Sequence, residues 1–143
     1  MKQIVIPLIA AILAGCAAIE TRSWGEWISP DIAGTDTDAL SIFDWSDHPG
    51  VIVSIDGVTD VETGFKKARL RPGKHTISFA DYPAEFGIHP KGSFDIEMKP
   101  GHRYRFGIRY CFICKPRKYA VWTDDMTNGE LVWGSRPDWG WRW

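Results

Sequence analysis

Two copies of one short pattern constrain the fold of this chain more than any other feature. Residues 70–79 read Leu-Arg-Pro-Gly-Lys-His-Thr-Ile-Ser-Phe, and residues 98–106 read Met-Lys-Pro-Gly-His-Arg-Tyr-Arg-Phe. Proline sets the φ angle of the first central residue of a type II turn, and glycine accepts the positive φ of the second. Because such turns match strand twist poorly in a two-residue hairpin, they predict corners between strands of two sheets.

Segments with a period of two fill most of the chain after residue 50. Alternation of apolar and polar residues indicates strands with one buried and one solvent-exposed face. The alternating segments are residues 51–55, 65–70, 75–79, 94–98, 104–110, 119–123 and 131–133. The predicted core consists of Val53, Ile55, Leu70, Ile77, Phe79, Ile96, Tyr104, Phe106 and Ile108.

Turn signals separate these segments. Asp56-Gly57 and Asn128-Gly129 are hairpin formers, because these residues tolerate positive φ. Residues 81–92 hold two prolines and two glycines and predict a loop. No segment after residue 15 shows a helical period. The sequence therefore predicts an all-β fold, a small antiparallel β-sandwich.

The first fifteen residues are built like a secretory signal peptide. Lys2 precedes the apolar run 4–13, which is too short to span a bilayer as a helix. The run ends in Leu13-Ala14-Gly15-Cys16, which resembles the lipobox of bacterial lipoproteins, where cleavage leaves an acylated cysteine as the first residue. We therefore predict that Cys16 carries a lipid anchor. The alternative is an ordinary secretory signal with a chance cysteine.

The residue after Cys16 and the charge of the chain bear on location and partners. Ala17 stands where an aspartate would favour inner-membrane retention in enteric bacteria, so the resemblance implies the outer membrane, with the domain facing the periplasm. Several acyl chains on one cysteine would suffice as an anchor, since each buried methylene contributes about 0.8 kcal/mol. A net charge of −1 argues against a nucleic-acid partner, which requires clustered positive charge.

These features divide the chain into four parts. They are a signal peptide (1–15), a lipidated N-terminus and partly ordered tether (16–47), a β-sandwich domain (48–134) and a tryptophan-rich tail (135–143). Residues 39–45 of the tether are predicted to lie on the domain as an edge strand. The length suits one domain with its own core.

The strand and corner pattern resembles a known family. The residues are Leu70-x-Pro72-Gly73-x-x-x-Ile77-x-Phe79 and then Phe94-x-Ile96-x-Met98-x-Pro100-Gly101-x-x-Tyr104-x-Phe106. Over residues 51–110 this pattern is similar to PEGA-type domains and to bacterial lipoproteins like them, and residues 125–134 resemble the closing hairpin of those lipoproteins. The resemblance implies a small immunoglobulin-like or prealbumin-like sandwich at the cell surface, without catalytic residues.

Cys111 and Cys114 are the cysteines that remain if Cys16 is lipidated. Fully extended, the segment between them would separate their Cα atoms by about 10 Å, so a disulfide requires a turn. In an oxidising compartment we expect a structural disulfide. A thioredoxin-like redox pair and a zinc site remain alternatives. Zinc would need two more ligands from His75, His89 or His102. We expect no metal and no cofactor.

Cations cluster between residues 103 and 118. The arginines of segment 103–109 share one strand face, and more cations follow in segment 115–118. They could meet phosphate or carboxylate groups of envelope lipid or glycan. Cross-strand pairing with Asp95 and Glu97 is the favoured alternative.

The tail places Trp139, Trp141 and Trp143 at alternate positions. In a strand this spacing gives one flat aromatic face, of the kind that stacks on sugars or anchors a protein interface. The same rings could close an edge of the sandwich. Both interpretations remain open, with a slight preference for binding because the chain end has few neighbours to cover the rings.

An enzyme is not expected. The chain has no Gly-x-Ser-x-Gly elbow, no glycine-rich phosphate loop and no His-Glu-x-x-His helix. The predicted function is a membrane-anchored envelope lipoprotein that acts as a binding or structural module, with peptidoglycan or an envelope protein as partner. The alternative is an envelope thiol-redox or hydrolytic enzyme that uses Cys111 and Cys114 or an unrecognised site.

Replacing Cys16 with serine tests the anchor. Without the sulfur no diacylglycerol can be attached, so the protein should move from the membrane fraction to the soluble periplasmic fraction. Cell fractionation followed by immunoblotting measures the change. Unchanged membrane fractionation would contradict the predicted lipidation.

Overall fold

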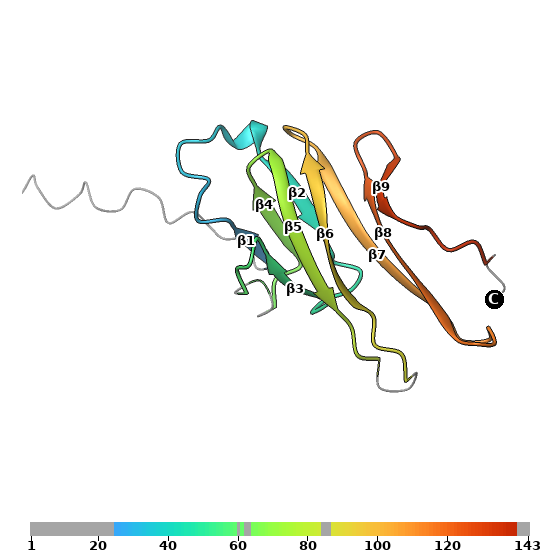
Figure 1. Cartoon of the computed structure of the whole chain (residues 1–143). Helices are drawn as coiled ribbons and strands as arrows, with labels where there is room; N and C mark the ends of the chain where they lie inside the picture. The colour runs from blue at the N-terminus through green and yellow to red at the C-terminus, as the bar shows by residue number, and fades with distance from the viewer. Residues whose placement is uncertain (1–24, 60, 62–63, 84–86, 140–143) are drawn as a thin grey trace, which may run out of the picture.

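The computed structural model describes residues 25–59, 61, 64–83 and 87–139, and the chain there forms two facing β-sheets (Figure 1). The predicted signal peptide and Cys16 lie outside these residues. The elements are β1 (Glu26–Ile28), the 3-10 helix η1 (Thr37–Ala39), β2 (Ser41–Asp44), β3 (Ile52–Ile55), β4 (Lys67–Leu70), β5 (Gly73–Ala80), β6 (Lys91–Met98), β7 (Arg103–Cys111), β8 (Lys118–Asp125) and β9 (Glu130–Gly134). Within the described ranges no helix is long and apolar enough to cross a membrane.

The larger sheet has six strands in the order β1-β4-β2-β7-β8-β9, and the smaller has three in the order β3-β5-β6. The all-β, two-sheet architecture confirms the coarse prediction. The larger sheet is mixed rather than antiparallel, because β1 pairs with β4 and β2 pairs with β7 in parallel. Each of these pairs joins strands that are distant in the sequence, and long connections permit the parallel arrangement.

Both Pro-Gly units are corners between the sheets, as predicted. The first connects β4 of the larger sheet to β5 of the smaller, and the second connects β6 of the smaller sheet to β7 of the larger. In Figure 1 β5 and β6 lie in front of β4 and β2. At the second corner the His102 amide donates to the Lys99 carbonyl at 3.2 Å, and Gly101 has φ +71°. This geometry is the expected hydrogen-bonded turn.

The first corner is closed in another way. Gly73 has φ +123° and already belongs to β5. The Arg71 carbonyl oxygen accepts a hydrogen bond from Nε2 of the buried His75 at 2.6 Å, and the other ring nitrogen lies 2.6 Å from a carboxylate oxygen of Asp56. The histidine side chain therefore satisfies a polar backbone group that the corner would otherwise leave without a partner.

The core lies between the sheets and is confirmed for all predicted members except Val53. The buried residues are Ile55, Leu70, Ile77, Phe79, Ile96, Tyr104, Phe106 and Ile108. Phe106 of β7 is fully buried, with its ring centroid 6.4 Å from Phe43, 5.5 Å from Phe79 and 6.4 Å from Phe94. It thus contacts aromatic rings from both sheets.

The prediction for Val53 is wrong because β3 is irregular. Its pairing with β5 shifts register between Ile52 and Ser54. Ile52 is fully buried, whereas Val53 is only partly buried. An extra residue in one strand reverses the alternation beyond it, so the pattern of period two assigned the wrong face.

The sandwich begins earlier than the predicted boundary at residue 48. Residues 25–47, assigned to a partly ordered tether, supply β1 and β2 to the six-stranded sheet. The expected edge strand at 39–45 is β2, an interior strand between β4 and β7. Phe43 and Trp45 are fully buried. Their burial explains why a segment rich in turn residues carries so many large aromatic side chains.

Truncation of Phe106 tests this packing. Phe106→Ala should lower the free energy of unfolding by about 3 to 5 kcal/mol, because it leaves a cavity among aromatic rings. Leu131→Ala, at a β9 residue that is 44% exposed, is the control and should cost under about 1 kcal/mol. Urea denaturation of both variants gives the comparison. Similar losses in the two would mean that Phe106 is not central to the core.

Candidate functional site at the β8–β9 edge

Unequal strand lengths create an open depression at one edge of the larger sheet. β9 pairs only with the Trp122–Asp125 part of β8, so residues 118–121 extend beyond it. The chain leaves β9 at Gly134, and the Ser135 amide donates to the Val121 carbonyl at 3.1 Å. Residues 135–139 then run beside this part of β8 (Figure 1). A depression of ≈ 560 Å³ lies between them.

Aromatic and charged side chains share the wall of this depression. Its lining consists of Phe79, Tyr119, Ala120, Val121, Trp133, Gly134, Ser135, Arg136, Asp138 and Trp139. Tyr119 is 42% exposed, and Trp139 is half-buried. Arg136 and Asp138 are exposed. The depression therefore presents aromatic rings and charged side chains of both signs to solvent.

Trp133 connects the depression to the core. Its ring stacks on Phe94 of β6 with 3.9 Å between centroids and 12° between planes, and it meets the edge of Phe79 at 5.9 Å. These contacts cross from the larger sheet to the smaller. The wall at this point is therefore part of the aromatic packing between the sheets and is held rigidly.

Arg136 holds the C-terminal segment in place. Its Nε and Nη2 donate to Oδ1 of Asp124 at 2.9 and 2.6 Å, and Nη2 also donates to the Gly129 carbonyl at 3.2 Å. The other carboxylate oxygen of Asp124 accepts from Trp122 Nε1 at 3.0 Å. An exposed ion pair contributes little stability by itself. Here these hydrogen bonds hold Arg136, and with it the start of the segment 135–139, against β8 and the β8–β9 turn.

Trp139 is placed by a cation. Lys118 Nζ lies 5.1 Å from the centroid of the Trp139 ring. A contact of this kind contributes about 0.5 to 1 kcal/mol at an exposed site. Trp141 and Trp143 lie outside the described residues, so the predicted alternate face is placed only at Trp139. The structure places Tyr119 and Trp133 in the same wall. Tyr119 is 20 residues from Trp139 in the sequence, so its place there could not be inferred from the spacing of the tail.

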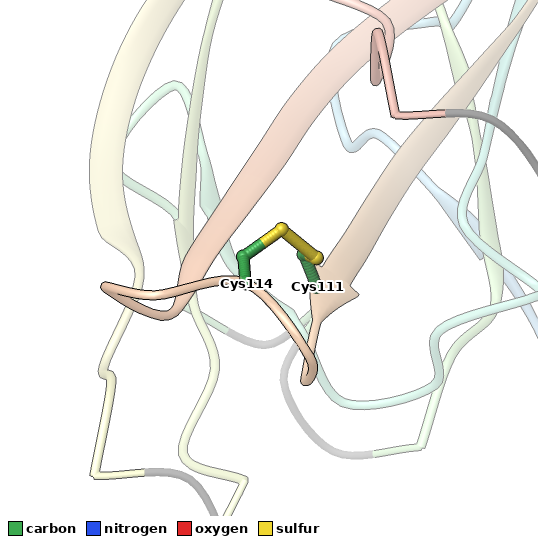
Figure 2. Close-up of a disulfide and its surroundings, with 2 residues drawn as sticks. All are labelled: Cys111 and Cys114. Atoms are coloured by element: carbon green, nitrogen blue, oxygen red, sulfur yellow. A yellow bond between two sulfur atoms is a disulfide. The ribbon is translucent and has the colours of Figure 1, made fainter.

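The predicted disulfide is present at the tip of the β7–β8 hairpin. Cys111 ends β7 and Cys114 lies in the connection, with 5.4 Å between their Cα atoms (Figure 2). The chain therefore makes the turn that a disulfide between these two cysteines requires. In the described ranges no group of three or more His, Cys, Asp or Glu side chains could hold a metal ion. His102 Nδ1 lies 2.7 Å from Asp125 Oδ2.

The predicted pairing of the β7 arginines with acidic residues of β6 is wrong, because β6 and β7 belong to different sheets. Arg103 instead donates to the buried carboxylate of Asp44 on the neighbouring β2. Burial alone would raise the pKa of Asp44, but hydrogen bonds from Ser46 and Arg103 outweigh it and hold the pKa below its usual value. Asp95 pairs with Lys74. The arginine face is thus partly structural.

Comparisons with protein-family models, with curated proteins and with solved structures give no match for this chain. The fold and the site together define a β-rich two-sheet domain with an open, aromatic-walled depression at one sheet edge.

Gly134 should be essential for the shape of this edge. It has φ +78°, and a Cβ atom there would lie 2.2 Å from the Val121 carbonyl oxygen. Gly129 has φ +77° with no heavy atom within 4 Å of that position, so it is a matched control. Gly129→Ala should lower the free energy of unfolding by about 1 kcal/mol and Gly134→Ala by about 2 to 4 kcal/mol.

Urea denaturation of the two variants measures the difference. Equal losses would show that positive φ alone matters and that the close approach of Gly134 to β8 does not shape the edge.

Proposed function

We propose that this chain is a lipid-anchored protein of a bacterial envelope whose two-sheet domain binds cell-wall glycan in the depression beside β8 and β9. One observation carries the proposal. The rings of Tyr119, Trp133 and Trp139 share that depression with Arg136 and Asp138. Aromatic rings present large apolar faces suited to the apolar faces of sugar rings, and charged side chains can hydrogen-bond the hydroxyl and amide groups around them.

The size of the depression favours a small unit of a polymer over a protein surface. Ligand sites commonly have volumes of about 300 to 1,000 Å³, and ≈ 560 Å³ lies within that range. A stable protein interface buries about 800 Å² on each partner. A site that is short, open and bounded by rings suits one or two sugars of a longer strand, which can enter and leave through its open side.

The N-terminal segment supports a location in the bacterial envelope. Lys2, the apolar run 4–13 and the small residues before Cys16 meet the needs of lipoprotein processing. Delivery to the periplasmic face of the outer membrane, which Ala17 implies, would place the domain beside peptidoglycan. The similarity of residues 51–110 to PEGA-type domains agrees with a noncatalytic role at the cell surface.

A thiol-redox role has less support. Redox-active pairs commonly owe their reactivity to a helix N-terminus, which lowers the pKa of one thiol. Cys111 and Cys114 instead lie at the end of a strand and in a hairpin connection. A bond in this position is suited to holding the shape of the tip.

Co-sedimentation with purified peptidoglycan tests the proposal. Tyr119→Ala removes a ring that is 42% exposed in the wall, whereas Leu131→Ala removes a β9 side chain that is 44% exposed and does not line it. The first variant should bind about 3- to 10-fold more weakly, because a ring stacking contact contributes about 0.5 to 1.5 kcal/mol. The control should bind like the original protein.

Trp139→Ala should weaken binding by a similar factor, with the melting temperature of each variant recorded to exclude unfolding. The proposal fails if the original protein does not sediment with peptidoglycan, or if the Leu131 control loses as much binding as the two aromatic variants.

A further inference from the structure

A second surface lies at the tip of the β7–β8 hairpin. Residues 112–117 connect the strands, and the disulfide between Cys111 and Cys114 closes the first part of this connection (Figure 2). Phe112 and Ile113, between the cysteines, are 53% and 82% exposed. Two large apolar side chains at the end of a hairpin have no role in the core of the sandwich. Side by side at the end of a hairpin, they are suited to an interaction surface.

The base of the tip is firmly attached to the sandwich. Tyr110 stacks beside Phe112 with 6.1 Å between ring centroids and 12° between planes. Its hydroxyl donates to a carboxylate oxygen of Asp81, the residue after β5. Burial, and next this hydrogen bond, raise the pKa of Tyr110, so the hydroxyl keeps its proton. The ring that supports Phe112 is thus held by the segment that follows β5 of the smaller sheet.

The tip is also strongly basic. Arg109, Lys115, Arg117 and Lys118 lie in or beside it, and residues 107–123 contain no aspartate or glutamate. Lys115, Arg117 and Lys118 are exposed. The chain as a whole has a net charge of −1, so this run of cations in the sequence is local, and Asp81 brings one carboxylate to the base of the tip. Apolar side chains at the point and cations around them complement an anionic lipid surface.

Strand directions place the tip at the end of the sandwich where the chain enters it. Glu26, which begins β1, is level across the sheet with Lys67, Asp44 and Arg105. β7 continues from Arg105 to Cys111, about 20 Å farther toward that end at about 3.3 Å per residue. The β7–β8 connection forms the lower right end of the sandwich in Figure 1.

The segment before β1 limits how far this end can be from the anchor. Residues 17–25 separate Cys16 from Glu26, so the Cα atoms of these two residues can be at most about 36 Å apart. An acyl group on Cys16 would therefore keep the entry point within about that distance of the membrane. We choose a bilayer as the partner because of this proposed anchor. The contacts with the bilayer would themselves come only from residues 109–118.

We propose that the disulfide-closed β7–β8 tip is a membrane-docking surface, which inserts Phe112 and Ile113 among the headgroups of an anionic phospholipid bilayer while the surrounding cations bind lipid phosphates. The disulfide restricts residues 112 and 113 before binding, so less conformational entropy is lost on insertion. A protein partner fits less well, because two side chains are far short of the area that a stable interface buries.

Binding to lipid vesicles tests the proposal. All strands described lie within residues 25–139, so a chain that begins at Ala17 keeps the whole sandwich and has no acyl group. It should sediment with vesicles of phosphatidylethanolamine and phosphatidylglycerol in a ratio of seven to three, and not with phosphatidylcholine vesicles. Raising the salt concentration to 0.5 M should release most of it, because the cations act near the surface.

Variants separate the apolar and charged contributions. Ile113→Ser should lower the vesicle partition coefficient about 10-fold, because it removes the most exposed apolar side chain of the tip. Lys115→Gln should lower it about 5-fold, the effect of about one basic residue near an anionic surface. Leu131→Ser is the control, because Leu131 is also exposed but lies on β9, and it should leave the coefficient unchanged.

Two results would overturn the proposal. One is failure of the original chain to bind anionic vesicles at low salt. The other is an equal loss of binding in the Ile113 variant and the Leu131 control. Each variant keeps Tyr119 and Trp139, so its sedimentation with peptidoglycan reports separately on the depression, and fractionation of Cys16→Ser reports separately on the anchor.

Discussion

The packing of aromatic rings between the two sheets is the interaction on which the rest of the structure depends. Phe106 is fully buried and lies against Phe43 of its own sheet and against Phe79 and Phe94 of the other. The two Pro-Gly corners bring strands to both sides of this cluster. Trp133 extends it to the edge by stacking on Phe94. The core and the wall of the depression are therefore one packed unit.

Both proposed surfaces arise from β8 and its connections. Beyond the end of β9, residues 119–121 form one wall of the depression, and the connection before β8 forms the tip. Lys118 connects the two, since it is one of the cations of the tip and lies over the ring of Trp139, which lines the depression. If the tip rests on a bilayer, the rigid β7–β8 hairpin fixes the orientation of the depression relative to that membrane. An anchored glycan-binding domain would gain a defined approach to the cell wall.

Much of the strand content could be predicted, because alternation is a local property. The faces of β5, β6 and β7 and the positions of both corners agree with the pattern of residues 70–79 and 94–108, although only the second corner is the predicted hydrogen-bonded turn. The bulge in β3 could not be predicted, since nothing in the sequence marks the extra residue. The interior position of β2 was also missed. Its partners are β4 and β7, and the turn residues around it resemble a linker when their long-range contacts are unknown.

The sequence alone determined most of the strands after residue 50, where the chain changes sheets and that Cys111 and Cys114 need a turn to meet. These properties depend on residues within about ten positions of each other. Only the tertiary structure decided that the larger sheet is mixed and that Tyr119, Trp133 and Trp139 share one depression. The reason is physical. Strand order and side-chain convergence are set by packing between distant segments, and no local pattern encodes which segments will pack together.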